Sequence, residues 1–261
     1  MKFAKVFVAL CFVPTFAGAY PTGTQFGVGL SVTTGVNAFT GYLNKEAESF
    51  WGKRLGYRID FAGTKLVRSK INSTVNRIID GRDIEIGDSI GIQDVKIEAK
   101  HFGGMLDFYP FGNTWFLGGW RLSGGYYGGQ FDVTAHVAGG DENGEFGLGH
   151  NRYKYANGAF QASAMANWNY NGPYVGTGFD LGVFAGFKIY FDVGAVFTRK
   201  VAKLSLDVPE DDLYKWNGSE WALVDPDDLE RDKEESLREA QTEADKIKYF
   251  PIVKLGLMYR F

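Results

Sequence analysis

The sequence predicts an all-β protein: a transmembrane antiparallel up-and-down β-barrel of eight strands. Three observations predict it, namely an export signal at the start, many short segments of alternating polarity, and a final segment with one apolar face. Glycine (35 of 261 residues) and aromatic residues (16%) are abundant, as is typical of barrels built from short strands. After the export signal, no apolar run reaches the roughly 20 residues that a helical span requires.

The first 19 residues have the order of a cleaved secretory signal peptide. Lys2 and Lys5 precede an apolar run, and Ala17-Gly18-Ala19 forms a small-residue cleavage site. We therefore expect one mature domain, residues 20–261. Cys11 is the only cysteine and lies in the signal, so the mature chain cannot form disulfides. Without the two lysines the net charge changes from −3 to −5 (−3 − 2), which gives no support to nucleic-acid binding.

The final segment, residues 249–261, alternates with period two, which indicates a strand with two different faces. A membrane barrel shows an apolar face with aromatic girdles to lipid, and its inward face can be polar. Arg260 and Lys254 belong to the face that we expect to point inward. The outward face would carry Val253, Leu255, Leu257, Tyr259 and Phe261.

Eight alternating segments predict the strands. In three of them the alternation changes phase, at Lys100-His101, Gly128-Gly129 and Gly172-Pro173. We interpret the first change as a β-bulge. Beyond the second change, Phe131, Val133 and Ala135 are expected to continue the outward face. If the last two changes separated strands, the count would be ten. The predicted strands are residues 26–32, 36–43, 52–62, 95–108, 115–137, 160–179, 187–198 and 249–261.

The connections between these strands alternate in length. Long polar ones lie near residues 63–93, 138–157 and 207–246, and the others are short. Short periplasmic turns and long outer loops are typical of outer-membrane barrels, so we expect the long connections to be extracellular. The last long connection also predicts a charged helix that begins after Asp225, a plausible N-cap with acidic residues following it.

Charged residues recur on the face that we predict to point inward. An eight-stranded barrel has a lumen just wide enough for side chains, and an unpaired buried charge is costly. We therefore predict a network of ion pairs that fills the lumen, with a narrow polar pore as the alternative. The predicted network consists of Arg54, Arg58, Asp60, Asp107, Arg121, Asp192, Lys254 and Arg260.

Four stretches resemble small outer-membrane β-barrel proteins of Gram-negative bacteria, the eight-stranded OmpA-like and OmpW-like group. They are AGA at 17–19, HFGGMLDFYPFGN at 101–113, the pair GPYVGTGF and FDVGAVF at 172–179 and 191–197, and the final YFPIVKLGLMYRF. The resemblance implies a place in the bacterial outer membrane, in contact with its lipid and lipopolysaccharide. It also implies that the barrel-assembly machinery recognises a C-terminal signal made of Leu255, Leu257, Tyr259 and Phe261.

The function follows less directly from the sequence. His101, His136 and His150 lie on separate segments, and neither a metal-ligand spacing nor a catalytic triad can be recognised around them. We therefore predict no catalytic residue, cofactor or metal site, and no enzyme. The leading hypothesis is a structural or surface-interaction protein whose loops bind an extracellular partner. A narrow porin-like channel or carrier is the alternative, and a lipid-modifying enzyme is a lower alternative.

Overall fold

The computed structural model describes residues 20–65, 67, 69–70, 72–73, 90–139, 145–156, 158 and 160–261. The predicted signal peptide with Cys11, and most of the first predicted long loop, lie outside these residues. Among the described residues, no helix combines the length and the apolar character needed to cross a membrane.

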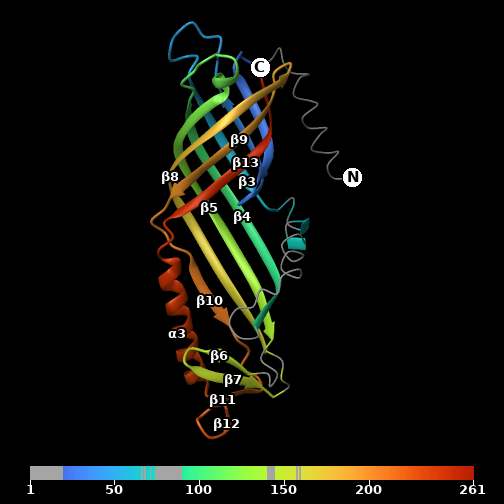
Figure 1. Cartoon of the computed structure of the whole chain (residues 1–261), viewed down its shortest axis with the longest axis vertical. Coiled ribbons are helices and arrows are strands. Elements are labelled where there is room, and N and C mark those ends of the chain that lie inside the picture. Colours follow the sequence, from blue (N-terminus) through green and yellow to red (C-terminus); the bar gives the residue numbers. More distant parts are fainter. Residues whose placement is uncertain are drawn as a thin grey trace.

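Eight antiparallel strands close into a barrel, which confirms the predicted fold class and strand count (Figure 1). Each strand pairs with its neighbours in the chain, and the last strand closes the barrel by pairing with the first. The alternative of ten barrel strands is wrong. The barrel strands are β1 (Thr24–Ser31), β2 (Gly35–Tyr42), β3 (Leu55–Gly63), β4 (Ile90–Phe108), β5 (Trp120–Gly139), β8 (Phe160–Phe184), β9 (Phe187–Phe197) and β13 (Tyr249–Arg260).

One end of the barrel carries three compact connections, and we call it the short-turn end. These are residues 43–54, residues 109–119 with the 3-10 helix η2 (Phe116–Gly119), and the turn at Ala185 and Gly186. Both turn residues have positive φ (41° and 84°), as two-residue hairpin turns that match the strand twist require. The long connections leave from the opposite end.

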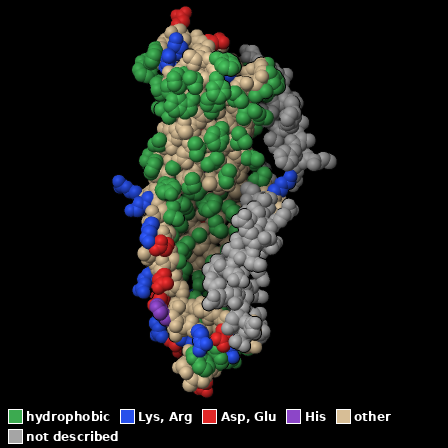
Figure 2. Space-filling model, viewed as in Figure 1, with side chains coloured by type: hydrophobic (Ala, Val, Ile, Leu, Met, Phe, Trp, Pro, Cys, Tyr) green, Lys and Arg blue, Asp and Glu red, His purple; other side chains and the backbone are tan. Residues whose placement is uncertain are grey.

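The barrel wall shows the alternation expected of a membrane strand. In β3, Leu55, Tyr57, Ile59 and Phe61 are exposed, whereas Arg58 and Asp60 between them are buried. Figure 2 shows hydrophobic side chains spread over the half of the barrel near the short-turn end, while charged side chains gather farther down. The outward face is thus apolar where lipid would surround it.

The three predicted phase changes lie at one level of the wall. His101 pairs with Gly129, and Gly129 pairs with Tyr170. The strands pass this level without a bulge, since the one register shift between β4 and β5 lies at Ile92/Asp94. The predicted bulge at Lys100-His101 is therefore wrong.

The predicted outward course of Phe131, Val133 and Ala135 is also wrong, because the unbroken alternation of β5 places these side chains on the inner face. Beyond the common level the outward positions of β5 and β8 carry polar side chains such as Asp132 and Asn169. The apolar face changes side because the outer surface there meets water instead of lipid. The change of phase thus marks the edge of the membrane belt.

Beyond this level β4, β5 and β8 continue as an open sheet, joined at its edge by β10 (Lys203–Asp207) (Figure 1). A second sheet lies at the far end, with strand order β12-β11-β7-β6. We call this sheet together with α3 the head. Its elements are β6 (Glu145–Leu148), β7 (Asn151–Tyr155), β11 (Leu213–Trp216), β12 (Trp221–Leu223) and α3 (Pro226–Ala244).

The head packs around an apolar core that Ala162 of β8 and Val208 after β10 complete. The helix α3 begins as predicted, because the Asp225 side chain accepts a hydrogen bond from the Asp227 amide. Its Leu229 is fully buried against the inner face of the second sheet. The described parts of the second and third long connections are therefore folded structure. Their core consists of Phe146, Leu148, Tyr153, Tyr155, Ala162, Val208, Leu213, Val224 and Leu229.

Candidate functional site: the lumen and the head pocket

Arg58 on β3 is the centre of an ion network inside the barrel. It donates a bidentate pair of bonds to Asp107, with Nε to Oδ2 at 2.5 Å and Nη2 to Oδ1 at 2.9 Å. Its Nη1 also donates to Asp192 Oδ2 at 2.9 Å. Arg58 is 2% exposed, and the two carboxylates are 0% and 3% exposed. Such two-pronged, charge-assisted bonds fix the guanidinium in position.

Arg121 and Arg260 extend this network toward the short-turn end. Arg121 Nη2 donates to Asp192 Oδ1 at 2.6 Å, and its Nη1 binds Asp180. Arg260 Nη2 donates to Asp180 Oδ2 at 2.9 Å. We call these six residues the central network. Among the described residues it joins three arginines (Arg58, Arg121, Arg260) to three aspartates (Asp107, Asp180, Asp192), so its charges balance.

A smaller cluster lies next to the central network on the side of the head. Lys254 Nζ is 2.8 Å from Asp60 Oδ1, and His101 Nε2 is 3.0 Å from the same oxygen. Lys254 also donates to the Tyr127 hydroxyl at 3.1 Å. All four side chains are buried. This cluster fills the lumen at a second level.

An aromatic layer follows at the level where the membrane belt ends. Tyr170 and Phe250 stack with ring centroids 4.0 Å apart, and Trp168 meets Phe250 edge-on at 5.4 Å. Phe131 contacts Phe250 at 5.6 Å. Rings packed at these distances leave little room for water. The lumen is therefore filled by side chains at three successive levels.

Seven of the eight predicted lumen charges point into the barrel, and Arg54 does not. Arg54 precedes β3 in the connection at the short-turn end, where its Nε donates to the Pro110 carbonyl at 3.2 Å. Asp180 is not among the predicted lumen charges, because the predicted strand ends at residue 179, whereas β8 continues to Phe184. The alternation that puts Tyr174 inward also puts Asp180 inward, and this was the available signal.

The predicted C-terminal signal lies on the outer wall. Leu255 and Leu257 are exposed on the lipid-facing side of β13. Tyr259 and Phe261 are half-buried, and their rings contact each other with centroids 4.8 Å apart. Recognition of these side chains by an assembly machinery remains a prediction.

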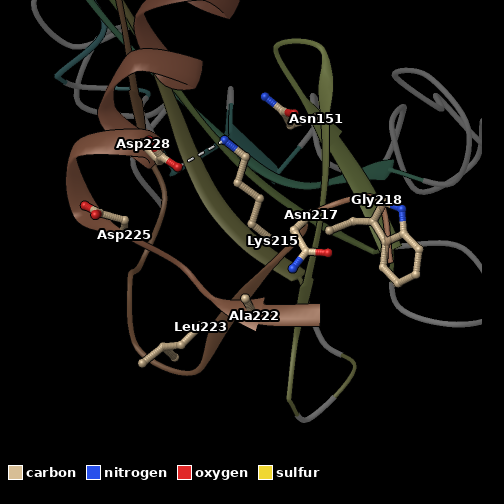
Figure 3. A pocket seen from close by; sticks show the side chains of 9 residues that line it. Asn151, Lys215, Asn217, Gly218, Ala222, Leu223, Asp225 and Asp228 are labelled. Carbon is tan, nitrogen blue, oxygen red and sulfur yellow. Dashed lines mark ion pairs between the residues drawn. The ribbon is translucent and has the colours of Figure 1, made fainter. Parts of the chain in front are cut away.

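A pocket of about 530 Å³ opens in the head between the β11–β12 hairpin and the start of α3 (Figure 3). Lys215 points across it, with its Nζ 3.6 Å from Asp228 and 2.9 Å from Asp232. Asn151 and Tyr153 also donate to Asp232. The lining residues are Asn151, Lys215, Trp216, Asn217, Gly218, Ala222, Leu223, Asp225 and Asp228.

Asp232 and Tyr153, next to this pocket, have shifted pKa values. Burial raises the pKa of the Asp232 carboxyl, but hydrogen bonds from Tyr153, Lys215 and Asn151 outweigh it, and the pKa lies below its usual value. Burial, and then the bond to Asp232, raise the pKa of the Tyr153 hydroxyl. Asp232 therefore stays ionised, and Tyr153 stays a donor. The pocket offers oriented donors, carboxylates and one indole, which suits binding a polar ligand.

The three histidines lie in separate parts of the structure and have different contacts. His101 is in the lumen, and His150 Nδ1 lies 3.1 Å from Glu235 in the head. His136 Nδ1 is 2.9 Å from Ser163 Oγ, and its other ring nitrogen lies 3.5 Å from Lys96 Nζ. In a catalytic triad a carboxylate orients the ring from this second nitrogen, which here faces a lysine. In the described part of the chain, no cluster of three or more His, Cys, Asp or Glu could hold a metal ion.

A closed eight-stranded barrel with an apolar outer belt and a filled lumen defines an outer-membrane-type β-barrel. The solved structures to which it is similar belong to this class. CarO of Acinetobacter baumannii superposes with a TM-score of 0.57 at 13% identity, over 92% of this chain and 98% of that one. CarO2 of the same organism gives 0.57 at 17% identity, over 92% and 99%. This chain thus has the fold of the small outer-membrane barrels. No protein-family model and no curated protein matches the sequence.

Proposed function

We propose that this protein is an integral outer-membrane barrel with a surface-interaction role, in which the barrel anchors the head and the head binds a partner outside the cell. The main support for this proposal is the contrast between the barrel and the head. The lumen is filled with mutually paired charges, whereas the head is a folded unit with an open polar pocket. Outer-membrane lipid and lipopolysaccharide would surround the belt, and the barrel-assembly machinery would insert it.

The size and lining of the head pocket support this role. Its volume of about 530 Å³ lies within the range of roughly 300–1,000 Å³ that is common for ligand sites. Trp216 and Lys215 supply an aromatic face and a cation, and Asn217 adds an amide. A connection that only joined two strands would not need an apolar core and a helix of 19 residues.

The alternative, a narrow channel or carrier, has less support. A channel requires a continuous water-filled path through the lumen. Arg58 and Arg121 both contact Asp107 across the lumen, and each side chain is 2% exposed or less, so they block such a path. A lipid-modifying enzyme requires an activated nucleophile, and in the Ser163–His136 pair the second ring nitrogen of His136, where an orienting carboxylate would bind, faces Lys96 instead.

Cysteine labelling of intact cells tests whether the head is displayed outside. The predicted mature chain has no cysteine, so a single introduced thiol gives a clean signal. Ser219→Cys places it in the exposed β11–β12 hairpin, and Thr114→Cys places it in an exposed position at the short-turn end. We expect a membrane-impermeant maleimide to label Ser219→Cys on intact cells and Thr114→Cys only after lysis. The reverse result would put the head in the periplasm and end this proposal.

A further inference from the structure

The short-turn end of the lumen holds more positive than negative charge. The central network is balanced, with three arginines bound to three aspartates. Lys45, in the connection between β2 and β3, and Lys188, near the start of β9, lie beside it without a carboxylate partner in the described part of the chain. These two amino groups therefore lie in a partly buried site with no carboxylate among the described residues to compensate them.

Lys188 faces an open space. It lies opposite Gly182 in the β8–β9 pairing, on the inner face of the wall. Gly182 is exposed, and a Cβ built on it would meet only Lys188 Nζ, at 3.8 Å. Among the described residues the Lys188 side chain makes no hydrogen bond or ion pair, whereas its backbone pairs with β8 and β13. Its ammonium group is therefore free to bind a group that enters the mouth of the barrel.

Lys45 approaches the same mouth from the neighbouring connection. Its Nζ donates to the Gly118 carbonyl and lies 4.4 Å from the centroid of the Tyr109 ring. The guanidinium carbon of Arg260 lies 5.8 Å from the same centroid. Burial, and then the positive charges of Arg260, Lys188 and Arg121, lower the pKa of Lys45 to about 7. Protonation of Lys45 is thus weakened first by burial and then by the neighbouring cations, and an anion bound beside it would favour the charged form.

Arg260 supplies a donor that the protein leaves unused. Its side chain is 7% exposed, and its Nε and Nη2 bind Gln25 and Asp180. Its Nη1 is buried and has no hydrogen-bond partner among the described residues. A buried donor on a charged group without a partner is costly, so this atom favours an acceptor from outside the chain.

We propose that Lys45, Lys188 and Arg260 form a binding site for a phosphate group at the short-turn end of the lumen. A phosphate carries about −1.5 to −2 charges at neutral pH and offers three acceptor oxygens, which matches the surplus of two cations and the free arginine donor. Arginine and lysine are the usual phosphate ligands in proteins. Free phosphate and the phosphate of a lipid headgroup share this chemistry. The site does not depend on the proposed function of the head.

Thermal unfolding of the purified full-length barrel in uncharged detergent tests the site. Inorganic phosphate is compared with chloride at equal ionic strength and fixed pH, and its binding is measured by calorimetry. We expect phosphate to raise the melting temperature of the wild type. Lys188→Gln should weaken phosphate binding about tenfold or more, which is the usual effect of losing one charge-assisted contact. Lys45→Gln should act in the same direction. Lys203→Gln, which removes an exposed lysine on β10, is the matched control and should leave binding unchanged.

A short-chain phosphatidic acid, added in a second series, separates the two sources of phosphate. Binding of both probes assigns the site to the phosphate group itself, and binding of the lipid alone assigns it to a headgroup. Equal melting temperatures in chloride, phosphate and the lipid would overturn the proposal. Equal weakening by Lys203→Gln and Lys188→Gln would also overturn it, because it would mean non-specific attraction. The wild-type comparison remains decisive if a variant fails to fold.

Discussion

Replacing Arg58 with methionine is expected to destabilise the folded barrel by about 3–5 kcal/mol, the usual cost of removing one partner from a buried ion pair. Arg58 binds both Asp107 and Asp192, and all three side chains are nearly inaccessible to water. Without the guanidinium, two carboxylates would remain in the lumen with Arg121 as their shared ion-pair partner among the described residues. The loss of unfolding free energy is measured by denaturant unfolding of the protein in detergent. The heat-modified gel mobility of the barrel reports the folded fraction.

Arg54→Met is the matched control for this prediction. It makes the same chemical change in the same part of the chain, but Arg54 lies in the connection outside the lumen. Its effect should be about 1 kcal/mol, the usual net contribution of a hydrogen bond to a backbone carbonyl. If Arg58→Met were as stable as Arg54→Met, the central network would not be what holds the lumen closed.

Replacing Leu229 with alanine is expected to unfold the head and leave the barrel intact. Leu229 is fully buried between α3 and the second sheet, where it packs in one cluster with Leu213 and Tyr153. A buried leucine truncated to alanine costs about 2–5 kcal/mol, which is a large share of the stability of so small a core. The barrel strands close through their own pairing, so they should not depend on α3.

Limited proteolysis reports on the folding of the head, and gel mobility reports on the folding of the barrel. In the Leu229→Ala variant, a protease should cut within residues 145–155 or 213–244 at concentrations that spare the wild type, and the barrel should keep its heat-modified mobility. Glu234→Ala changes an exposed position of the same helix and is the control. Loss of the barrel together with the head would show that they form one cooperative unit, contrary to this account.

The barrel could be predicted from sequence because lipid imposes a simple rule on its wall. In β3, every second residue from Leu55 to Phe61 is apolar, and the structure exposes these residues. The rule that apolar side chains face outward fails where the outer surface of the wall passes from lipid to water. Phe131 and Val133 looked like a continued outward face, but the outer surface at their level meets water, so they turn inward. A phase change in the pattern and a bulge in the backbone look alike in a sequence.

The head could not be predicted as a folded unit, because its strands are too short for a periodic signal. β12 has three residues, and β6 and β11 have four each. They are stable only because they pair across two distant connections, as Tyr214 of one does with Lys154 of the other. Only α3, with its Asp225 cap and its charged length, carried a local signal.

The lumen charges followed from alternation, but their partners did not. Parity along β3 places Arg58 inward, and parity along β9 places Asp192 inward, yet nothing in the sequence pairs them across 134 positions. The balance of three arginines against three aspartates depends on Asp180 and on barrel closure. The surplus of Lys45 and Lys188 becomes visible only after that balance is known.

Single-channel recording of the refolded protein, residues 20–261, in a planar bilayer tests the central claim that the lumen is closed. We expect no discrete conductance steps, because charged pairs and stacked rings fill three levels of the lumen. The gel mobility of the protein verifies that it is folded. Regular steps of one size from the folded wild type would show an open path. That result would contradict the closed lumen and would move the channel alternative ahead of the surface-interaction role.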